Sequence, residues 1–225
     1  MIRLLLLVMT LAVGLPGAAA RAQADSLPHA SRTVAIMGVP QYLLTRGVRL
    51  DVEYRPVGSR HALVVAPQGY YGTREGPGRG AFSDDVQLDG WGVEVQHKLY
   101  TRSEALRDLG NFYFTWGAGY HRFRFRYEDF VLTPVPQSGD PPLLQLEQGQ
   151  RTVTNQRVMA TAALGSTFFI QNELMVDLFL GFTVRAPFFE GLPPDGGQPF
   201  ADMVWEYNFR GVSPYCGVKF GLYVF

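Results

Sequence analysis

The chain has 225 residues, of which 47% are hydrophobic and 13% aromatic, and its 20 basic residues balance its 20 acidic ones. A balanced charge without a basic cluster argues against a nucleic-acid-binding protein. The single cysteine, Cys216, excludes an internal disulfide, and the sequence has no metal-ligand cluster, phosphate-binding loop or nucleophile elbow. We therefore predict no catalytic, cofactor-binding or metal-binding residue from motifs.

The first 24 residues have the pattern of a secretory signal peptide. Arg3 is followed by an apolar run to about Leu15, and Ala22-Gln23-Ala24 matches an Ala-x-Ala cleavage site. The apolar run is shorter than the roughly 20 residues that a membrane-spanning helix needs. We predict a signal peptide over residues 1–24, and not an N-terminal anchor, with residues 25–225 as one exported domain.

The clearest strand pattern lies in Gly47–Arg55, where apolar and charged residues alternate without exception. One face carries Val48, Leu50, Val52 and Tyr54, and the other carries Arg49, Asp51, Glu53 and Arg55. A repeat of two residues is that of a β-strand, because a helix would not separate these residues onto two faces.

Seven more segments show the same alternation with varying clarity. In chain order they are Thr33–Val39, His61–Tyr71, Trp91–Leu99, Phe112–Tyr127, Val158–Leu164, Leu174–Ala186 and Val212–Phe225. The first two patterns are weaker, and Pro67 lies within the second, where it cannot donate a ladder hydrogen bond. Counting all segments predicts eight strands.

The segment Phe112–Tyr127 changes phase along its length. Phe112, Phe114 and Trp116 occupy even positions, whereas Phe123, Phe125 and Tyr127 occupy odd ones opposite Arg122, Arg124 and Arg126. Two interpretations remain open: a β-bulge near Gly117–Gly119, or an outer half that extends beyond the bilayer, where lipid no longer decides which face is apolar.

The predicted connections fall into two length classes. Pro56–Arg60, Thr101–Gly110 and about Phe169–Glu173 are short, whereas Gly72–Gln87, Glu128–Gln150 and Phe189–Tyr207 are long and rich in Gly and Pro. With Thr33–Val39 as the first strand, Pro40–Arg46 becomes a short first outer loop. Short periplasmic turns that alternate with longer outer loops are typical of an outer-membrane barrel.

The ending Ala22-Gln23-Ala24, the strand Gly47–Arg55 and the terminal Tyr223-Val224-Phe225 together resemble small outer-membrane β-barrel proteins of Gram-negative bacteria, of OmpX-like and OmpA-barrel-like architecture. The resemblance implies an all-β, eight-stranded antiparallel up-and-down transmembrane β-barrel in the outer membrane. It also implies a monomer in contact with outer-membrane lipid and lipopolysaccharide, and recognition of Phe225 by the barrel-assembly machinery.

The C-terminus departs from that pattern in one respect. Gly217, Lys219 and Gly221 share the register of Phe225, where the resemblance would place apolar residues. Either the even-numbered residues of this strand face lipid and Phe225 lies just past them, or a bulge intervenes.

The polar face predicts the contents of the barrel. It includes Arg49, Asp51, Glu53, Arg55, Glu94, Lys98, Arg157, Asp177, Arg185 and Lys219. Because an eight-stranded barrel is just wide enough for side chains, and buried charges persist when paired, we expect a packed ion-pair network. A polar pore is the alternative. We expect a structural or surface-interaction role.

Two other classes of function remain as alternatives. A lipid-modifying barrel enzyme needs a histidine near the outer rim with a partner that activates a nucleophile, and among His29, His61, His97 and His121 only His121 has a suitable place. A soluble lipocalin-like carrier would turn its apolar faces inward. The Arg122/Arg124/Arg126 row could face lipopolysaccharide phosphates, and Asp84-Asp85 could bind a divalent cation, although solvated surfaces explain both.

Overall fold

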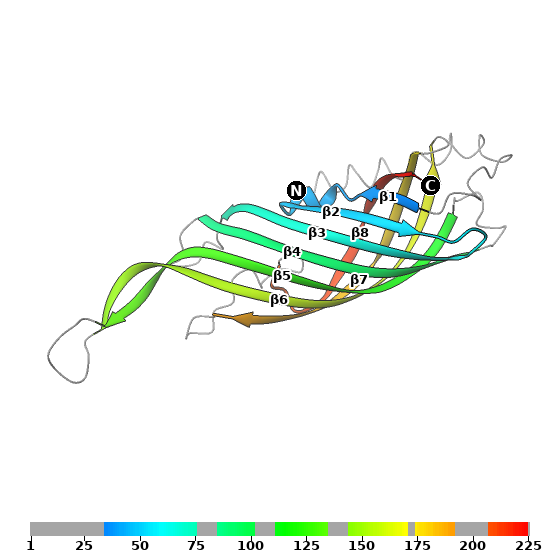
Figure 1. Cartoon of the computed structure of the whole chain (residues 1–225). Coiled ribbons are helices and arrows are strands. Elements are labelled where there is room, and N and C mark those ends of the chain that lie inside the picture. The colour runs from blue at the N-terminus through cyan, green and yellow to red at the C-terminus, as the bar shows by residue number, and fades with distance from the viewer. Residues whose placement is uncertain are drawn as a thin grey trace.

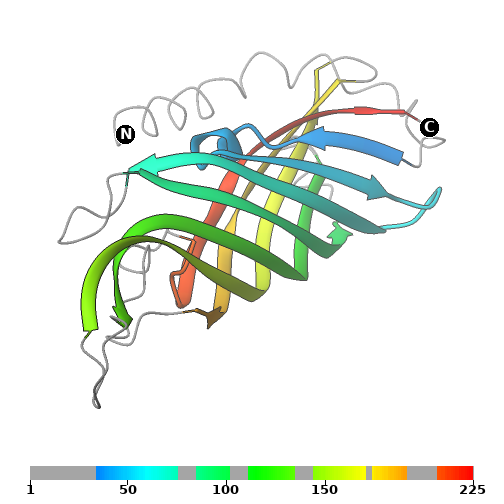
Figure 2. The same cartoon turned by 60° about the vertical axis from the view of Figure 1, so that its left-hand side comes forward.

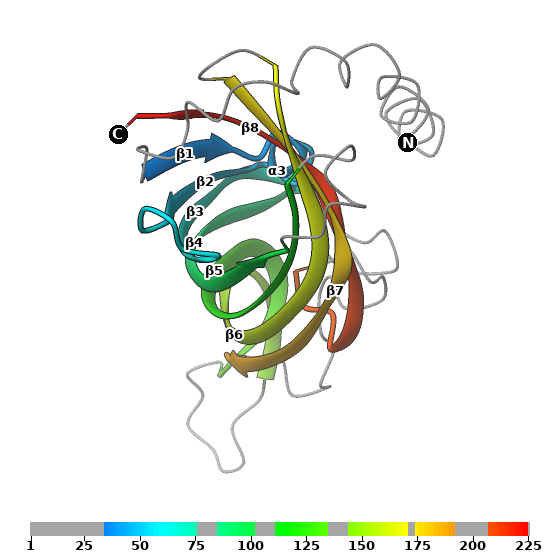
Figure 3. The same cartoon turned by 90° about the vertical axis from the view of Figure 1, so that its right-hand side faces the viewer.

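The computed structural model of the chain describes residues 34–75, 85–101, 111–134, 144–170, 174–191 and 207–224. The predicted signal peptide and Phe225 lie outside these residues. In the described part, eight antiparallel strands pair in sequence order, and pairing of the first with the last closes the barrel (Figures 1 and 3). The strands are β1 (Val34–Gly38), β2 (Gly47–Tyr54), β3 (His61–Glu75), β4 (Asp85–Tyr100), β5 (Asn111–Pro134), β6 (Leu144–Phe169), β7 (Leu174–Glu190) and β8 (Gly211–Tyr223). The predicted all-β, eight-stranded, up-and-down barrel is confirmed.

The two ends of the barrel differ. Strands β5 and β6 continue as a paired hairpin well past their neighbours (Figures 1 and 2), and we call this side the hairpin end. At the opposite side, the start of β1 lies beside the end of β8, because Ala35 pairs with Tyr223. We call that side the terminal end.

The prediction of a long loop over Glu128–Gln150 is wrong for most of its length. Pairing continues in register from Glu128 opposite Gln150 to Pro134 opposite Leu144. Likewise, β3 and β4 remain paired to Glu75 opposite Asp85. Backbone hydrogen bonds can extend a ladder without an alternating apolar pattern, so the Gly- and Pro-rich composition misled the sequence prediction. Residues 76–84, 135–143 and 192–206 lie outside the described residues.

Of the two interpretations of the phase change in β5, the bulge near Gly117–Gly119 is excluded. The pairing of β5 with both neighbours runs without interruption from Tyr113 to Arg126. The strand keeps one set of residues outside throughout, so Phe114 and Trp116 are exposed while Phe123, Phe125 and Tyr127 are buried inside the barrel. The phase change is therefore a change in residue type on each face: toward the hairpin end, the outer face becomes charged and the inner face becomes aromatic.

Beyond β5, the facing predicted from alternation is confirmed on every strand for which it was clear. In β2, Val48 is 48% exposed while the neighbouring Arg49 is 2% exposed. In β8 the even-numbered residues face outward and the register with β7 is unbroken, which removes the need for a C-terminal bulge. Pro67 lies on the outer face of β3.

A short helix occupies the place where β1 would continue along β8. Strand β1 ends at Gly38, opposite Phe220, and α3 (Gln41–Leu44) follows in the link that was predicted as a short loop. The Gln41 side chain approaches β8 at Gly217, where a Cβ atom would overlap it. Glycine therefore admits the helix against the inner wall. In the ranges that the structure describes, none of the helices has the length and hydropathy to cross a membrane.

Candidate functional site

The interior of the barrel contains two clusters of ion pairs. In the first, Lys98 Nζ lies 2.8 Å from Glu53 Oε2 and 2.7 Å from Asp177 Oδ2. Tyr100 Oη donates to Glu53 at 2.6 Å, and Tyr113 Oη donates to Asp177. One ammonium thus faces two carboxylates, and each carboxylate accepts a further phenol hydrogen. The cluster links β2, β4, β5 and β7.

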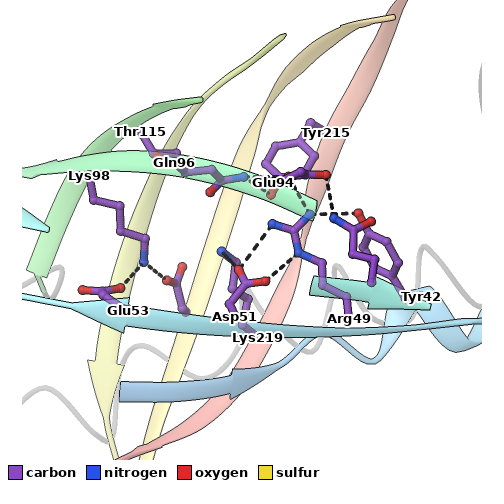
Figure 4. Close-up of polar contacts among 12 residues, drawn as sticks. Tyr42, Arg49, Asp51, Glu53, Glu94, Gln96, Lys98, Thr115, Tyr215 and Lys219 are labelled. Carbon is purple, nitrogen blue, oxygen red and sulfur yellow. Dashed lines mark hydrogen bonds and ion pairs between the residues drawn. The ribbon is translucent and has the colours of Figure 1, made fainter. Parts of the chain in front are cut away.

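The second cluster is centred on Arg49 of β2. Its Nε lies 2.6 Å from Asp51 Oδ1, and its Nη1 lies 2.8 Å from Glu94 Oε2. Lys219 of β8 reaches the same Asp51 at 2.7 Å. Figure 4 shows these side chains directed toward one another across the lumen.

The Glu94 carboxylate accepts further hydrogen bonds from neighbouring side chains. Gln68 and Gln96 each donate an amide hydrogen to Glu94 at 2.9 Å, and Gln96 also donates to the Tyr215 phenol at 3.1 Å. The Tyr42 phenol oxygen, on α3, accepts a hydrogen bond from Arg49 Nη1 at 2.9 Å.

These clusters confirm the predicted packed, ion-paired interior. The predicted charged residues that are at most 5% exposed are Arg49, Asp51, Glu53, Glu94, Lys98, Arg157, Asp177 and Lys219. The other two, Arg55 and Arg185, are partly exposed, and the Arg55 guanidinium lies 4.8 Å from the centre of the Tyr100 ring. Because each buried carboxylate in the two clusters faces a cation, the desolvation cost of these charges is offset by short charge-assisted hydrogen bonds.

His121 is part of this interior, and its hydrogen bonds determine its tautomer. Arg157 Nη2 lies 2.8 Å from His121 Nδ1, and because a guanidinium can only donate, Nδ1 must accept. The ring hydrogen then resides on Nε2, which lies 3.6 Å from Glu94 Oε1. The nitrogen that could act as a base is therefore occupied by Arg157, and the side chain is 1% exposed.

The hairpin end of the lumen is filled by an aromatic cluster that the sequence did not reveal. It consists of Tyr70, Val86, Leu88, Phe123, Phe125, Tyr127, Val153 and Tyr207. Tyr207 belongs to the link before β8 and was predicted to lie in a loop. Its ring packs 5.1 Å from that of Phe123, its hydroxyl donates to the Thr45 carbonyl, and its own carbonyl accepts from Arg157. The odd-numbered aromatic residues of β5, Phe123, Phe125 and Tyr127, were the sequence feature from which this aromatic cluster could have been predicted.

The outer face of the barrel carries a continuous set of exposed apolar side chains. Among them are Ile36, Val48, Leu50, Leu63, Val65, Trp91, Val93, Val95, Phe114, Trp116, Val158, Leu164, Leu180, Phe182, Val184, Val212, Phe220 and Leu222. We call this set the outer belt. Leu180 is 64% exposed and Val212 is 61% exposed, which is unusual for residues of a regular sheet in water.

Toward the hairpin end, the outer face of β4 and β5 becomes charged. Trp91 and Tyr120 pack with ring centres 5.7 Å apart, and Arg122, Arg124 and Arg126 follow on the same face of β5. Asp89 lies 3.4 Å from Arg126 and 4.0 Å from Arg124. Arg124 and Arg126 thus share one partner carboxylate on the neighbouring strand.

The remaining predicted features fall at separate places. Asp85 begins β4 and Asp84 lies outside the described residues. Within the described ranges there is no group of three or more His, Cys, Asp and Glu side chains that could hold a metal ion. Cys216 is exposed on the outer face of β8. His61 and His97 also lie on the outer face, and His29 is outside the described residues.

The fold and its contents define a closed eight-stranded β-barrel with a charged, filled interior and an apolar exterior. No protein-family model matches the chain, and no curated protein matches it in sequence. Among solved structures it is similar to Acinetobacter baumannii CarO, with 12% identity over 86% of this chain and 98% of that chain, and a TM-score of 0.43.

Proposed function

We propose that this protein is an integral outer-membrane β-barrel with a structural or surface-interaction role and no open pore. The observation that carries the proposal is the inversion of the barrel, with apolar side chains outside and ion pairs inside. Exposed Leu180 and buried Lys98 illustrate the two sides. A lipid-facing exterior and a polar interior are the pattern of outer-membrane barrels.

The same observation disfavours the soluble lipocalin-like alternative. A soluble carrier needs an apolar cavity and a polar exterior. Here the strands β2, β4, β7 and β8 turn their charged residues into the lumen, where the ion-pair clusters join them to one another. An exposed apolar belt of this extent would favour aggregation in water.

The contents of the lumen support the absence of a pore and of catalysis. The two ion-pair clusters and the aromatic cluster around Tyr207 occupy successive levels of the barrel. His121, the candidate for a lipid-modifying enzyme, has its accepting nitrogen bound to Arg157. We propose that His121 is a structural residue of the network.

Fractionation and gel electrophoresis test the proposal. We expect the chain in the outer-membrane fraction, with a migration that changes when the sample is boiled, because a closed membrane barrel resists detergent until it is heated. Recovery in the soluble periplasmic fraction without a heat-dependent shift would overturn the proposal.

We further propose that the Arg122/Arg124/Arg126 row contacts the phosphates of lipopolysaccharide. The row begins directly beyond the Trp91–Tyr120 pair, where aromatic residues mark the edge of an apolar belt, and guanidinium groups suit bidentate phosphate contacts. Replacing all three with alanine should lower the lipopolysaccharide that copurifies with the barrel. The control is an Arg60→Ala variant, which is altered at the terminal end. Equal amounts of copurified lipopolysaccharide in the wild type, the triple variant and the control would contradict the contact.

Recognition of Phe225 by the barrel-assembly machinery stays a prediction of the resemblance.

A further inference from the structure

Two histidines interrupt the apolar outer face at the terminal end of the barrel. His61 is the first residue of β3, and His97 lies on β4 between the outward-facing Val95 and Leu99. In the ladder, His61 pairs with Leu99 and Leu63 pairs with His97. The two histidines are therefore diagonal neighbours on the same face, and their rings meet with centres 5.2 Å apart.

The ring nitrogens of the two histidines converge. His61 Nδ1 lies 3.2 Å from His97 Nε2. Two nitrogens that each lie about 2.0–2.1 Å from a tetrahedral Zn²⁺ are about 3.3–3.4 Å apart. The pair thus already has nearly the spacing of two ligands on one metal ion, and only a small adjustment of the rings would be needed.

The surroundings hold both rings while leaving one side open. The His97 ring packs against Trp116 with centres 4.3 Å apart, and it is half-buried. His61 is exposed, and its backbone N–H donates to Ser59 Oγ at 2.9 Å, which ties the start of β3 to the preceding turn. Positions on paired strands give a metal site better-defined geometry than positions on a loop.

From this geometry we propose that His61 Nδ1 and His97 Nε2 together bind one borderline divalent transition-metal ion of the Zn²⁺ class. Imidazole nitrogens suit such ions, and water completes the coordination on the exposed side. In the metal-free pair one ring donates an N–H to the other. On binding, that ring carries its hydrogen on its other nitrogen, so that both facing nitrogens present lone pairs and no net proton is released.

The proposed site is separate from the charged interior and independent of the proposed function. Lys98 follows His97 directly in β4 but points to the opposite face, into the lumen. A membrane barrel and a soluble one would both retain the histidine pair, because strand pairing creates it. With two protein ligands we expect weaker binding than in a four-ligand structural zinc site.

Isothermal titration of the untagged, folded full chain with ZnCl₂ tests the site. We expect one Zn²⁺ per chain, and at least tenfold weaker binding in His61→Ala and in His97→Ala, with wild-type binding in His29→Ala. Absence of uptake by the wild type, or wild-type affinity in both the His61→Ala and the His97→Ala variants, would overturn the proposal. The far-ultraviolet circular dichroism spectrum, which reports β-sheet content in a membrane or a soluble barrel, verifies that each variant is folded, and His61→Gln and His97→Gln replace any alanine variant that is not.

Electron paramagnetic resonance with Cu²⁺ as a second probe detects the nitrogen ligands of the bound metal through their hyperfine splitting. The wild type should show the splitting of two coordinated nitrogens, and each single variant should lose one of them. A wild-type spectrum that is unchanged in both variants would place the bound metal elsewhere and contradict the site.

Discussion

Lys98 Nζ lies 2.7 Å from Asp177 Oδ2, and this ion pair joins β4 to β7 across the lumen of the barrel. The two residues are 79 positions apart in the sequence. Because Lys98 also binds Glu53 at 2.8 Å, it is the single cation between two buried carboxylates in this cluster. Its removal therefore has a predictable consequence.

Lys98→Met should destabilise the folded barrel by about 3–5 kcal/mol, because two buried carboxylates lose their cation. Urea-dependent unfolding in detergent or vesicles, followed by tryptophan fluorescence, measures the change. The triple variant Lys98→Met with Glu53→Gln and Asp177→Asn should recover part of the loss, since no uncompensated charge remains. An equal loss in the single and triple variants would show that packing, and not charge, dominates this cluster.

Gly165→Ala should destabilise the protein by about 1–3 kcal/mol through overpacking. Gly165 pairs with Tyr113, and a Cβ atom there would overlap the Tyr113 phenol ring, which donates to Asp177. Gly69→Ala is the matched control, because no atom lies within 4 Å of its Cβ position. Similar unfolding midpoints for the two variants would contradict the predicted overlap.

Leu180→Arg should reduce insertion into lipid vesicles. Leu180 is 64% exposed in the outer belt, and an arginine on the lipid face of a barrel costs about 2–4 kcal/mol near the bilayer midplane. Gln87→Arg, on the outer face of β4 beyond Trp91, should have little effect. If Leu180→Arg folds as well as the wild type in vesicles, this face does not contact lipid.

His121→Ala should leave the lipid A profile of the producing cell unchanged, because Arg157 occupies the nitrogen that a catalytic base would need. Mass spectrometry of extracted lipid A, compared with cells that lack the protein and cells with the wild type, measures this. A modification that depends on the wild type and disappears with His121→Ala would establish an enzyme in place of the structural role. The variant should also be less stable, since Arg157 and Glu94 lose a shared neighbour.

Planar-bilayer recordings of the purified chain should show no discrete conductance steps. The ion-pair clusters around Arg49 and Lys98, and the aromatic cluster that includes Tyr207, fill the lumen of the described barrel. Reproducible ohmic steps from the folded protein would contradict the filled interior and favour the polar-pore alternative.

Alternation in the sequence predicted the eight strands and the faces of those with a clear pattern, but left the faces of β5 and β8 open. In Gly47–Arg55 the side chain of each residue points opposite to that of the next, so the local pattern separates Val48 from Arg49 without knowledge of any partner. For the same reason, alternation identified the polar set that enters the lumen.

The partners in each buried ion pair were decided only by the tertiary structure. Lys219 binds Asp51 from 168 positions away, and such pairs depend on barrel closure and strand register. The contact between His61 and His97 and the aromatic cluster that includes Tyr207 likewise form only when strand pairing brings distant segments together. Composition predicted loops where β5 and β6 form a long hairpin, because a backbone ladder can continue where side chains no longer alternate. Local periodicity thus determined the strands and the faces of those that alternate clearly, whereas closure of the barrel determined the contacts inside and across it.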